Sequence, residues 1–148
     1  MRDKKLWLIF IIIFIMIGCK SMAKDNSNNQ IDLSKLASLD NPVISPSGKY
    51  ILILEEKTDG KLNYYIFKIQ INDSTKKIIF TLDEKIFRKR DMNYICWDSS
   101  DWIWGYSGDV GVYYWSEMNM QWVKNVYLKE KQIQPPDILV KLRPNSFK

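Results

Sequence analysis

The chain of 148 residues contains no histidine at all. This absence excludes a Ser-His-Asp or Cys-His catalytic group, a zinc site with histidine ligands and an imidazole proton shuttle. Cysteine is nearly as scarce, because Cys19 and Cys96 are the only two. The fold therefore has to be held together by its core and its backbone hydrogen bonds rather than by a set of disulfides.

The sequence also lacks an apolar run long enough to cross a bilayer. The longest run, from Leu6 to Ile17, has 12 residues, whereas a spanning helix needs roughly 20. Basic residues precede this run and the small residue Gly18 follows it. A basic start, an apolar run and a small residue are the layout of a secretory signal peptide. We therefore expect residues 1–18 to be a signal peptide.

The end of the run, Met16-Ile17-Gly18-Cys19, resembles the lipobox of bacterial lipoproteins, a short aliphatic triplet that ends in Gly or Ala before an obligatory Cys. The resemblance implies cleavage between Gly18 and Cys19 and a diacylglyceryl group on the Cys19 thiol. Two or three acyl chains, palmitate among them, give stable membrane anchoring because each buried CH2 contributes about 0.8 kcal/mol. The alternative is an ordinary hydrophobic signal that happens to contain a cysteine.

The lipobox resemblance also implies a location. The protein is expected at the cell membrane or the outer membrane, lipid-anchored and facing the periplasm or the exterior. Lys20 follows the cysteine where an Asp would favour retention at the inner membrane, which favours the outer membrane in a cell that has one. The lipid on Cys19 is the only cofactor-like group that the sequence predicts.

The chain beyond the signal peptide is short and only mildly basic. The whole chain has 22 basic and 17 acidic residues, and without residues 1–18 it has 19 and 16, a net charge of +3. The remaining length suits one domain, and the mild charge of an exported chain argues against a nucleic-acid partner.

The second cysteine, Cys96, has no partner within the chain if Cys19 is lipidated. We therefore expect Cys96 to be buried and to pack as a small hydrophobic residue. The alternatives are a reactive thiol and an intermolecular disulfide bridge.

The pattern after the signal peptide predicts a tether followed by a β domain. Residues 19–41 comprise the lipidated N-terminus, a polar tether and a possible short helix capped by Asp32. Residues 42–148 form a single β-rich domain with an irregular C-terminal tail. Alternating residues in 64–71 predict a strand, and Asp59-Gly60 predicts a hairpin turn. The predicted fold is mainly β, an antiparallel meander of six to seven strands arranged as two blade-like units or a small sandwich, with strands near 50–55, 64–71, 76–82, 94–97, 102–107, 111–115 and 121–128.

One internal similarity supports the arrangement in two units. The stretch SPSGKYILIL from Ser45 aligns with WDSSDWIWGY from Trp97, each a polar turn followed by an aromatic residue and an apolar strand. SPSGKYI also resembles the S-P-D-G-K-Y-I opening of blades in bacterial β-propellers of the TolB and peptidase-associated kind, with Ser47 in place of the usual Asp. A complete propeller needs at least about four blades, and this chain has residues for two.

Aromatic residues are concentrated in the second half of the predicted domain. Trp102, Trp104 and Tyr106 are two apart, so they point to one face of a strand. Their size favours a core position, although such a row can also stack on sugars or on a partner protein. Tyr113 and Tyr114 face opposite ways, and one of them is expected at the surface.

Two sets of charged residues are candidates for function. Arg88, Lys89 and Arg90 could meet anionic lipid headgroups or other envelope phosphates, and with Tyr113 and Tyr114 they form the candidate binding surface. A second set consists of turn aspartates, Asp98, Asp101 and Asp109. These could bind Ca²⁺ or act as the acid and base of a glycosidase, but turn formation explains them more simply.

The sequence therefore predicts a lipid-anchored cell-envelope protein with a non-catalytic domain that binds an envelope protein or glycan. No catalytic residue and no metal site is expected. The alternatives are a carbohydrate-active hydrolase that uses the loop aspartates and an immunity or inhibitor lipoprotein.

Overall fold

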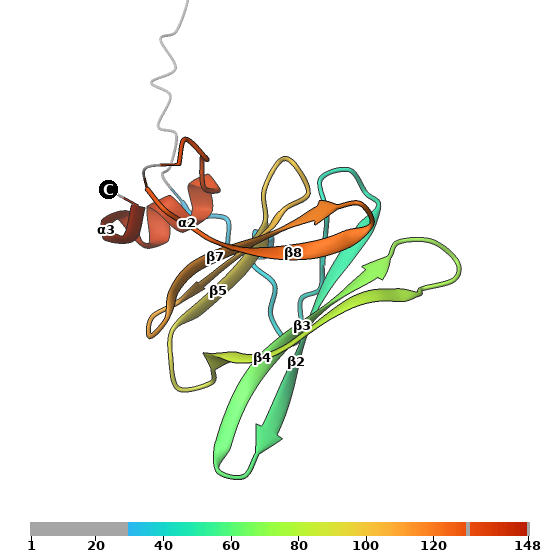
Figure 1. Cartoon of the computed structure of the whole chain (residues 1–148), viewed down its shortest axis with the longest axis horizontal. Helices are drawn as coiled ribbons and strands as arrows, with labels where there is room; N and C mark the ends of the chain where they lie inside the picture. Colours follow the sequence, from blue (N-terminus) through green and yellow to red (C-terminus); the bar gives the residue numbers. More distant parts are fainter. Residues whose placement is uncertain (1–29, 130, 148) are drawn as a thin grey trace, which may run out of the picture. The chain divides into compact units, whose positions relative to one another are not determined.

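A computed structural model of the chain describes residues 30–129 and 131–147. The predicted signal peptide, the Gly18–Cys19 cleavage site, the lipidation site Cys19 and most of the tether lie outside the described residues. The chain divides into two compact units, Met1–Gln30 and Ile31–Lys148. The fold described below is that of the second unit (Figure 1).

Two four-stranded antiparallel sheets make up this unit, in the orders β1-β2-β3-β4 and β5-β6-β7-β8. Neighbours in the sheet are neighbours in the chain, so the predicted antiparallel meander is confirmed, with eight strands instead of six or seven. The strands are β1 (Val43–Ile44), β2 (Tyr50–Asp59), β3 (Leu62–Ile71), β4 (Ile78–Arg88), β5 (Asn93–Trp97), β6 (Ile103–Ser107), β7 (Gly111–Met118) and β8 (Gln121–Val126).

The β2–β3 hairpin is the longest regular pairing in the first sheet. Its register runs from Tyr50 opposite Ile71 to Asp59 opposite Leu62. Gly60 turns the chain with a positive φ, a conformation that glycine adopts without steric cost. The hairpin turn predicted at Asp59-Gly60 is therefore present.

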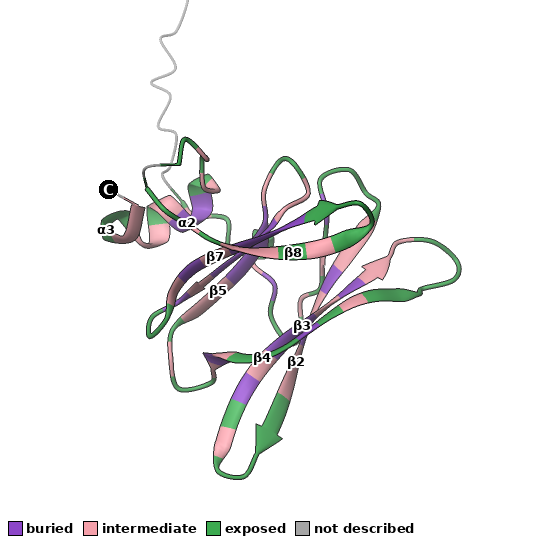
Figure 2. Cartoon of the chain, viewed as in Figure 1, coloured by how far each residue is buried: buried purple, intermediate pink, exposed green. Residues whose placement is uncertain are grey.

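The two sheets pack through one face each, here called the inner faces. The first sheet contributes alternate residues of β2 and β3, and the second contributes alternate residues of its strands, as the period of two requires. The Phe67 and Trp115 rings meet edge to face with centroids 4.9 Å apart. Figure 2 shows buried residues along the middle of both sheets. The buried members of this core are Ala37, Leu52, Leu54, Phe67, Ile69, Leu82, Phe87, Ile95, Trp97, Ile103 and Trp115.

The outer face of the second sheet carries the predicted aromatic row. Trp104 is fully buried, and Trp102 and Tyr106 pack around it, so the row is core and not an exposed binding face. Ile138 and Leu139 cover this face from a C-terminal helix, α2 (Asp137–Leu142), which is followed by α3 (Pro144–Phe147). Figure 1 shows both helices at the C-terminal end of the chain.

The C-terminal tail that the sequence led us to expect as irregular ends in these two short helices. Pro135 and Pro136 precede the first of these helices, and Pro136 is the N-cap of α2. Proline is compatible with a helix start, where its missing N–H would have no partner within the helix.

The two aligned turns have related backbone geometry. In the first, the Ser45 N–H donates to the Tyr50 carbonyl at 2.9 Å, and in the second the Asp98 N–H donates to the Trp102 carbonyl at 2.9 Å. A side-chain bond joins the turns, because the Ser47 N–H donates to the Asp101 carboxylate at 3.0 Å. Each turn connects the first strand of its sheet to the second, so the two sheets repeat one plan.

Candidate functional site

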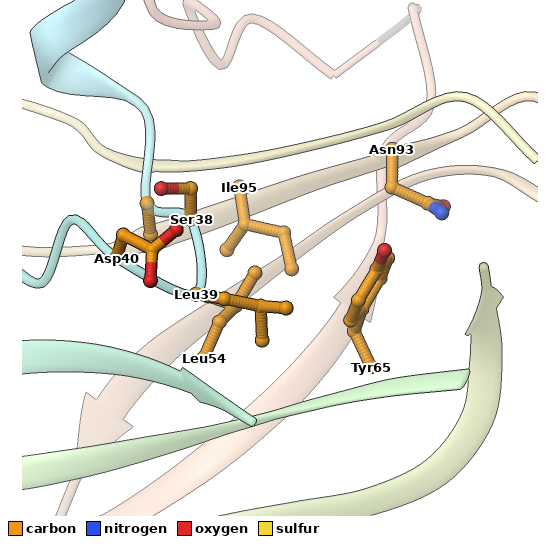
Figure 3. A pocket seen from close by; sticks show the side chains of 8 residues that line it. Ser38, Leu39, Asp40, Leu54, Tyr65, Asn93 and Ile95 are labelled. Atoms are coloured by element: carbon orange, nitrogen blue, oxygen red, sulfur yellow. The ribbon is translucent and has the colours of Figure 1, made fainter. Parts of the chain in front are cut away.

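A pocket of about 340 Å³ lies at one end of the contact between the inner faces. Its apolar base consists of Leu54 from β2 and Ile95 from β5, and Tyr65 of β3 and Asn93 of β5 form a more polar wall (Figure 3). The fourth side is the chain segment before β1. The complete lining is Ala37, Ser38, Leu39, Asp40, Leu54, Tyr65, Asn93 and Ile95.

Backbone bonds hold the segment before β1 over the pocket. A short 3-10 helix, η1 (Leu33–Lys35), begins it, and the Asp32 carboxylate caps this helix as predicted by accepting from the Ser34 N–H at 3.2 Å. The Ala37 N–H then donates to the Ile95 carbonyl at 2.8 Å, which extends the second sheet by one bond. Ser38 and Asn41 pair across a tight turn that carries Leu39 and Asp40 to the pocket rim.

The polar wall contains hydrogen-bonding groups that have no partner within the described chain. The Asn93 amide nitrogen donates to the Arg88 and Asp91 carbonyls at 2.7 and 3.0 Å, which fixes the side chain. Its amide oxygen is buried and has no donor among the described residues. The Tyr65 hydroxyl, which points toward Asn93 in Figure 3, has no hydrogen bond to a described residue either. Buried polar atoms in folded proteins are nearly always paired, so the Asn93 amide oxygen is an exception. The Tyr65 hydroxyl belongs to a half-buried residue and is free to bond to a ligand.

The structure separates the two tyrosines of the candidate binding surface. Tyr114 is only 5% exposed, stacks on Trp104 with centroids 5.1 Å apart and belongs to the outer-face core. It is therefore not available as a surface contact, which corrects that part of the prediction. Tyr113 is half-buried at the edge of the inner core, with the Lys124 ammonium 4.6 Å from its ring centroid.

The three basic residues of the candidate surface are also divided. The Arg88 guanidinium pairs with Asp109 at 3.0 Å at the β6–β7 turn, and the Tyr113 hydroxyl donates to the Val110 carbonyl of the same turn at 3.2 Å. The structure thus brings Arg88 and Tyr113 to one turn. Lys89 and Arg90 follow β4 instead, beside the β2–β3 turn.

Lys89 is held by both oxygens of Glu56, at 2.8 and 2.9 Å. This hydrogen bond and the negative charge of Glu56 raise the pKa of the Lys89 ammonium. The ammonium is therefore a positive charge throughout the physiological range. Because Glu56 compensates it, Lys89 adds little net charge to the surface.

The loop aspartates do not converge. The Asp98 carboxylate accepts from the Ser100 and Trp102 N–H groups at 2.8 and 2.9 Å and from the Trp104 indole N–H at 2.9 Å. It therefore stabilises its own turn and the buried Trp104 side chain. Asp109 lies beyond the other end of β6, so the length of that strand separates the two carboxylates. In the described part of the chain, no three His, Cys, Asp or Glu side chains are grouped to hold a metal ion.

Cys96 is fully buried on the outer face of the second sheet and forms no disulfide. Burial, with a smaller contribution from Asp98, raises the pKa of its thiol to about 12. The thiolate is the reactive form of cysteine, so Cys96 packs as the small hydrophobe that the sequence predicted.

Sequence reasoning missed the pocket because its lining comes from segments far apart in the chain. The alternation of residues 64–71 places Tyr65 on the same face as Phe67 and Ile69, but nothing local indicates that the turn at Leu39 and Asp40 lies opposite it. The apolar side chain of Leu39 within a polar turn was the available signal. The structure leaves it 45% exposed.

Comparisons with known proteins add no relative: no family model, no curated protein and no solved structure matches this chain. Within the described residues, none of the helices is both long and apolar enough to span a bilayer.

Proposed function

We propose that this protein is a lipid-anchored component of the cell envelope whose β domain binds a glycan in the pocket between the sheets and catalyses no reaction. The lipobox-like motif at Met16–Cys19 supports the anchor. The single observation that supports binding is the pocket wall, where the half-buried Tyr65 hydroxyl has no hydrogen bond to a described residue and lies beside an apolar base.

The chemistry of the lining suits a sugar ring. A sugar presents C–H groups on its faces and hydroxyl groups around its edge, and the pocket combines the aliphatic Leu54 and Ile95 with hydroxyl, amide and carboxylate side chains. Its volume of about 340 Å³ falls in the lower part of the roughly 300–1,000 Å³ usual for small-molecule sites. A sugar hydroxyl placed beside Tyr65 would give the tyrosine hydroxyl a hydrogen-bond partner.

The binding proposal is tested by replacing Tyr65 with phenylalanine, which removes the hydroxyl and keeps the ring. The probe is a chitooligosaccharide, with cellooligosaccharide and maltooligosaccharide as parallel probes, and affinity is measured by calorimetry. We expect Tyr65→Phe to weaken binding about 2- to 12-fold, because a net hydrogen bond contributes about 0.5–1.5 kcal/mol.

Tyr64→Phe is the matched control, because Tyr64 is the neighbouring tyrosine on the opposite face of β3 and is not part of the pocket. It should leave the affinity unchanged. Equal affinity of the Tyr65→Phe variant and the unmodified protein, or no binding of any of the three oligosaccharides, would contradict the glycan proposal.

The anchor is tested separately by Cys19→Ser. The unmodified protein is expected to carry acyl groups, to begin at Cys19 and to partition with membranes. Without the thiol, no thioether to lipid can form and cleavage after Gly18 should fail. The variant should therefore have the mass of the uncleaved precursor and carry no acyl group. Intact-mass spectrometry and metabolic palmitate labelling report both. An acyl group that persists in Cys19→Ser refutes the assignment.

A further inference from the structure

A second hollow, of about 300 Å³, lies beside the β2–β3 turn and is lined by residues other than those of the glycan pocket. Lys61 belongs to the turn itself, and Leu62 and Asn63 begin β3. Lys89 and Arg90 come from the β4–β5 connection. We call this site the donor hollow.

Backbone pairing brings the two segments together. The Lys89 N–H donates to the Asn63 carbonyl at 2.9 Å, which fixes the β4–β5 connection against the start of β3. Lys61 and Arg90 are therefore held at one place although they are far apart in the chain. The sequence showed the basic run at 88–90, but it did not show that Lys61 joins it.

The donor hollow offers hydrogen-bond donors and no carboxylate in its lining. Lys61 has no acidic partner within ion-pair distance among the described residues, and the Arg90 side chain is 73% exposed and forms a long ion pair with Asp91 at 3.8 Å. The Asn63 amide oxygen already accepts from the Thr58 hydroxyl at 2.9 Å, so its NH2 group remains to donate. The Lys61 ammonium, the largely exposed Arg90 guanidinium and an amide donor match an anion.

We propose that the donor hollow binds the phosphate group of an anionic lipid headgroup and so holds the domain against the membrane surface. This proposal rests on the Cys19 anchor of the proposed function. The anchor matters because it supplies headgroups at a high effective concentration, at which a weak anion site is occupied without any further binding energy. A free phosphate ion in solution has no such advantage.

The tether is long enough for this contact. The twelve residues from Lys20 to Ile31 span at most about 40 Å when fully extended. The ten-residue strand β2, which ends at the turn that carries Lys61, is about 33 Å long. The extended tether is therefore longer than β2, and its length is compatible with a domain orientation in which the β2–β3 turn faces the membrane that holds Cys19.

The test uses the full acylated protein in nanodiscs with nitroxide-labelled headgroups, one set of phosphatidylcholine alone and one in which phosphatidylcholine and phosphatidylglycerol are mixed 2:1. Mass spectrometry first establishes the acyl group. The measured quantity is the paramagnetic relaxation enhancement at the Gly60–Asn63 and Lys89–Asp91 amides. We expect it to be at least fivefold larger in the anionic discs at low salt and to fall to the neutral-disc value at about 0.5 M salt, where charges are screened within about 4 Å.

Charge reversal identifies the residues. Lys61→Glu with Arg90→Glu should abolish the difference between the two kinds of disc, whereas Lys35→Glu with Lys76→Glu, which changes the net charge equally on exposed residues outside the hollow, should keep it. Thermal denaturation checks that both variants fold. A difference that survives Lys61→Glu with Arg90→Glu, or that the control pair also removes, overturns the proposal.

Free inorganic phosphate is the alternative ligand for the donor hollow, because it carries the same phosphate group as a lipid headgroup. Inorganic phosphate in millimolar excess is added to the neutral discs, and amide chemical shifts at the hollow are recorded. Shifts there without docking to anionic discs would identify a site for soluble phosphate and overturn the lipid assignment. Protein that lacks an acyl group would refute the anchor and this proposal together, whereas acylated protein that does not dock refutes this proposal alone.

Discussion

Replacing Trp115 with alanine is expected to lower the free energy of unfolding by about 3–5 kcal/mol, the usual range for a buried tryptophan. The side chain is 0% exposed at the centre of the contact between the sheets. It packs edge to face on Phe67 at 4.9 Å and lies 6.2 Å from Phe87 between centroids. Its removal leaves a cavity that rigid strands on both sides cannot fill.

The measurement is urea denaturation followed by far-UV circular dichroism. Trp115→Phe is the graded control: the Trp115 indole N–H is buried without a described partner, so its loss removes no hydrogen bond and should cost clearly less than the alanine change. Trp104→Phe differs, because it breaks the bond to Asp98 at 2.9 Å. A loss below about 1 kcal/mol for Trp115→Ala would mean that the sheets do not pack through this ring.

The second large effect is expected at Gly105, which faces the same core. A Cβ atom added there would lie 2.5 Å from the Phe87 ring and 3.1 Å from the Trp115 ring. Both rings are fully buried, so neither can move freely. Gly105→Ala should therefore destabilise by about 1–3 kcal/mol through overpacking, and Gly105→Val by more.

A double-mutant cycle shows whether the clash with Phe87 is the cause. In a Phe87→Leu background, the added Cβ at Gly105 has room, so the cost of Gly105→Ala should fall by about 1 kcal/mol or more. Gly108→Ala is the matched glycine control, because its nearest contact would be an ordinary 3.7 Å to the Met92 backbone. Equal costs at the two glycines, or additive effects at Gly105 and Phe87, would argue against close approach of the sheets here.

Much of the fold could be predicted because the patterns that indicate strands and turns involve residues close together in the chain. The alternation in 64–71 predicts β3, in which Phe67 and Ile69 do face the core. Asp59-Gly60 predicts the hairpin turn, and the SPSG and DSSD turns predict a repeated plan. Period-two patterns and turn residues depend on side chains within a few positions of one another.

The parts that could not be predicted depend on distant partners. β1 has only two residues and exists because Val43 and Ile44 pair with β2. The register between β3 and β4 shifts between Tyr65 and Phe67, so β4 continues to Arg88 where a shorter strand was expected. Helix α2 has six residues, too few to be stable alone, and it is supported by packing of Leu139 on the aromatic row.

The sequence likewise did not determine which face of each strand is buried. Four aliphatic residues in succession, Ile51 to Leu54, offer apolar side chains to both faces of a strand. Only Leu52 and Leu54 are buried, while Ile51 and Ile53 are half-buried on the outer face of the first sheet. Tyr113 and Tyr114 had to face opposite ways, but only the packing of α2 and Trp104 made Tyr114 the buried one.

The sequence by itself determined the period of the strands, the positions of the turns, the absence of histidine chemistry and the thiol at position 19 on which the anchor proposal depends. Only the tertiary structure decided which side chains share a surface: the pocket of Leu39, Leu54 and Tyr65, and the hollow that joins Lys61 to Arg90. The physical reason is that strand patterns arise from neighbours in the chain, whereas a site arises where strands and turns remote in sequence are packed together.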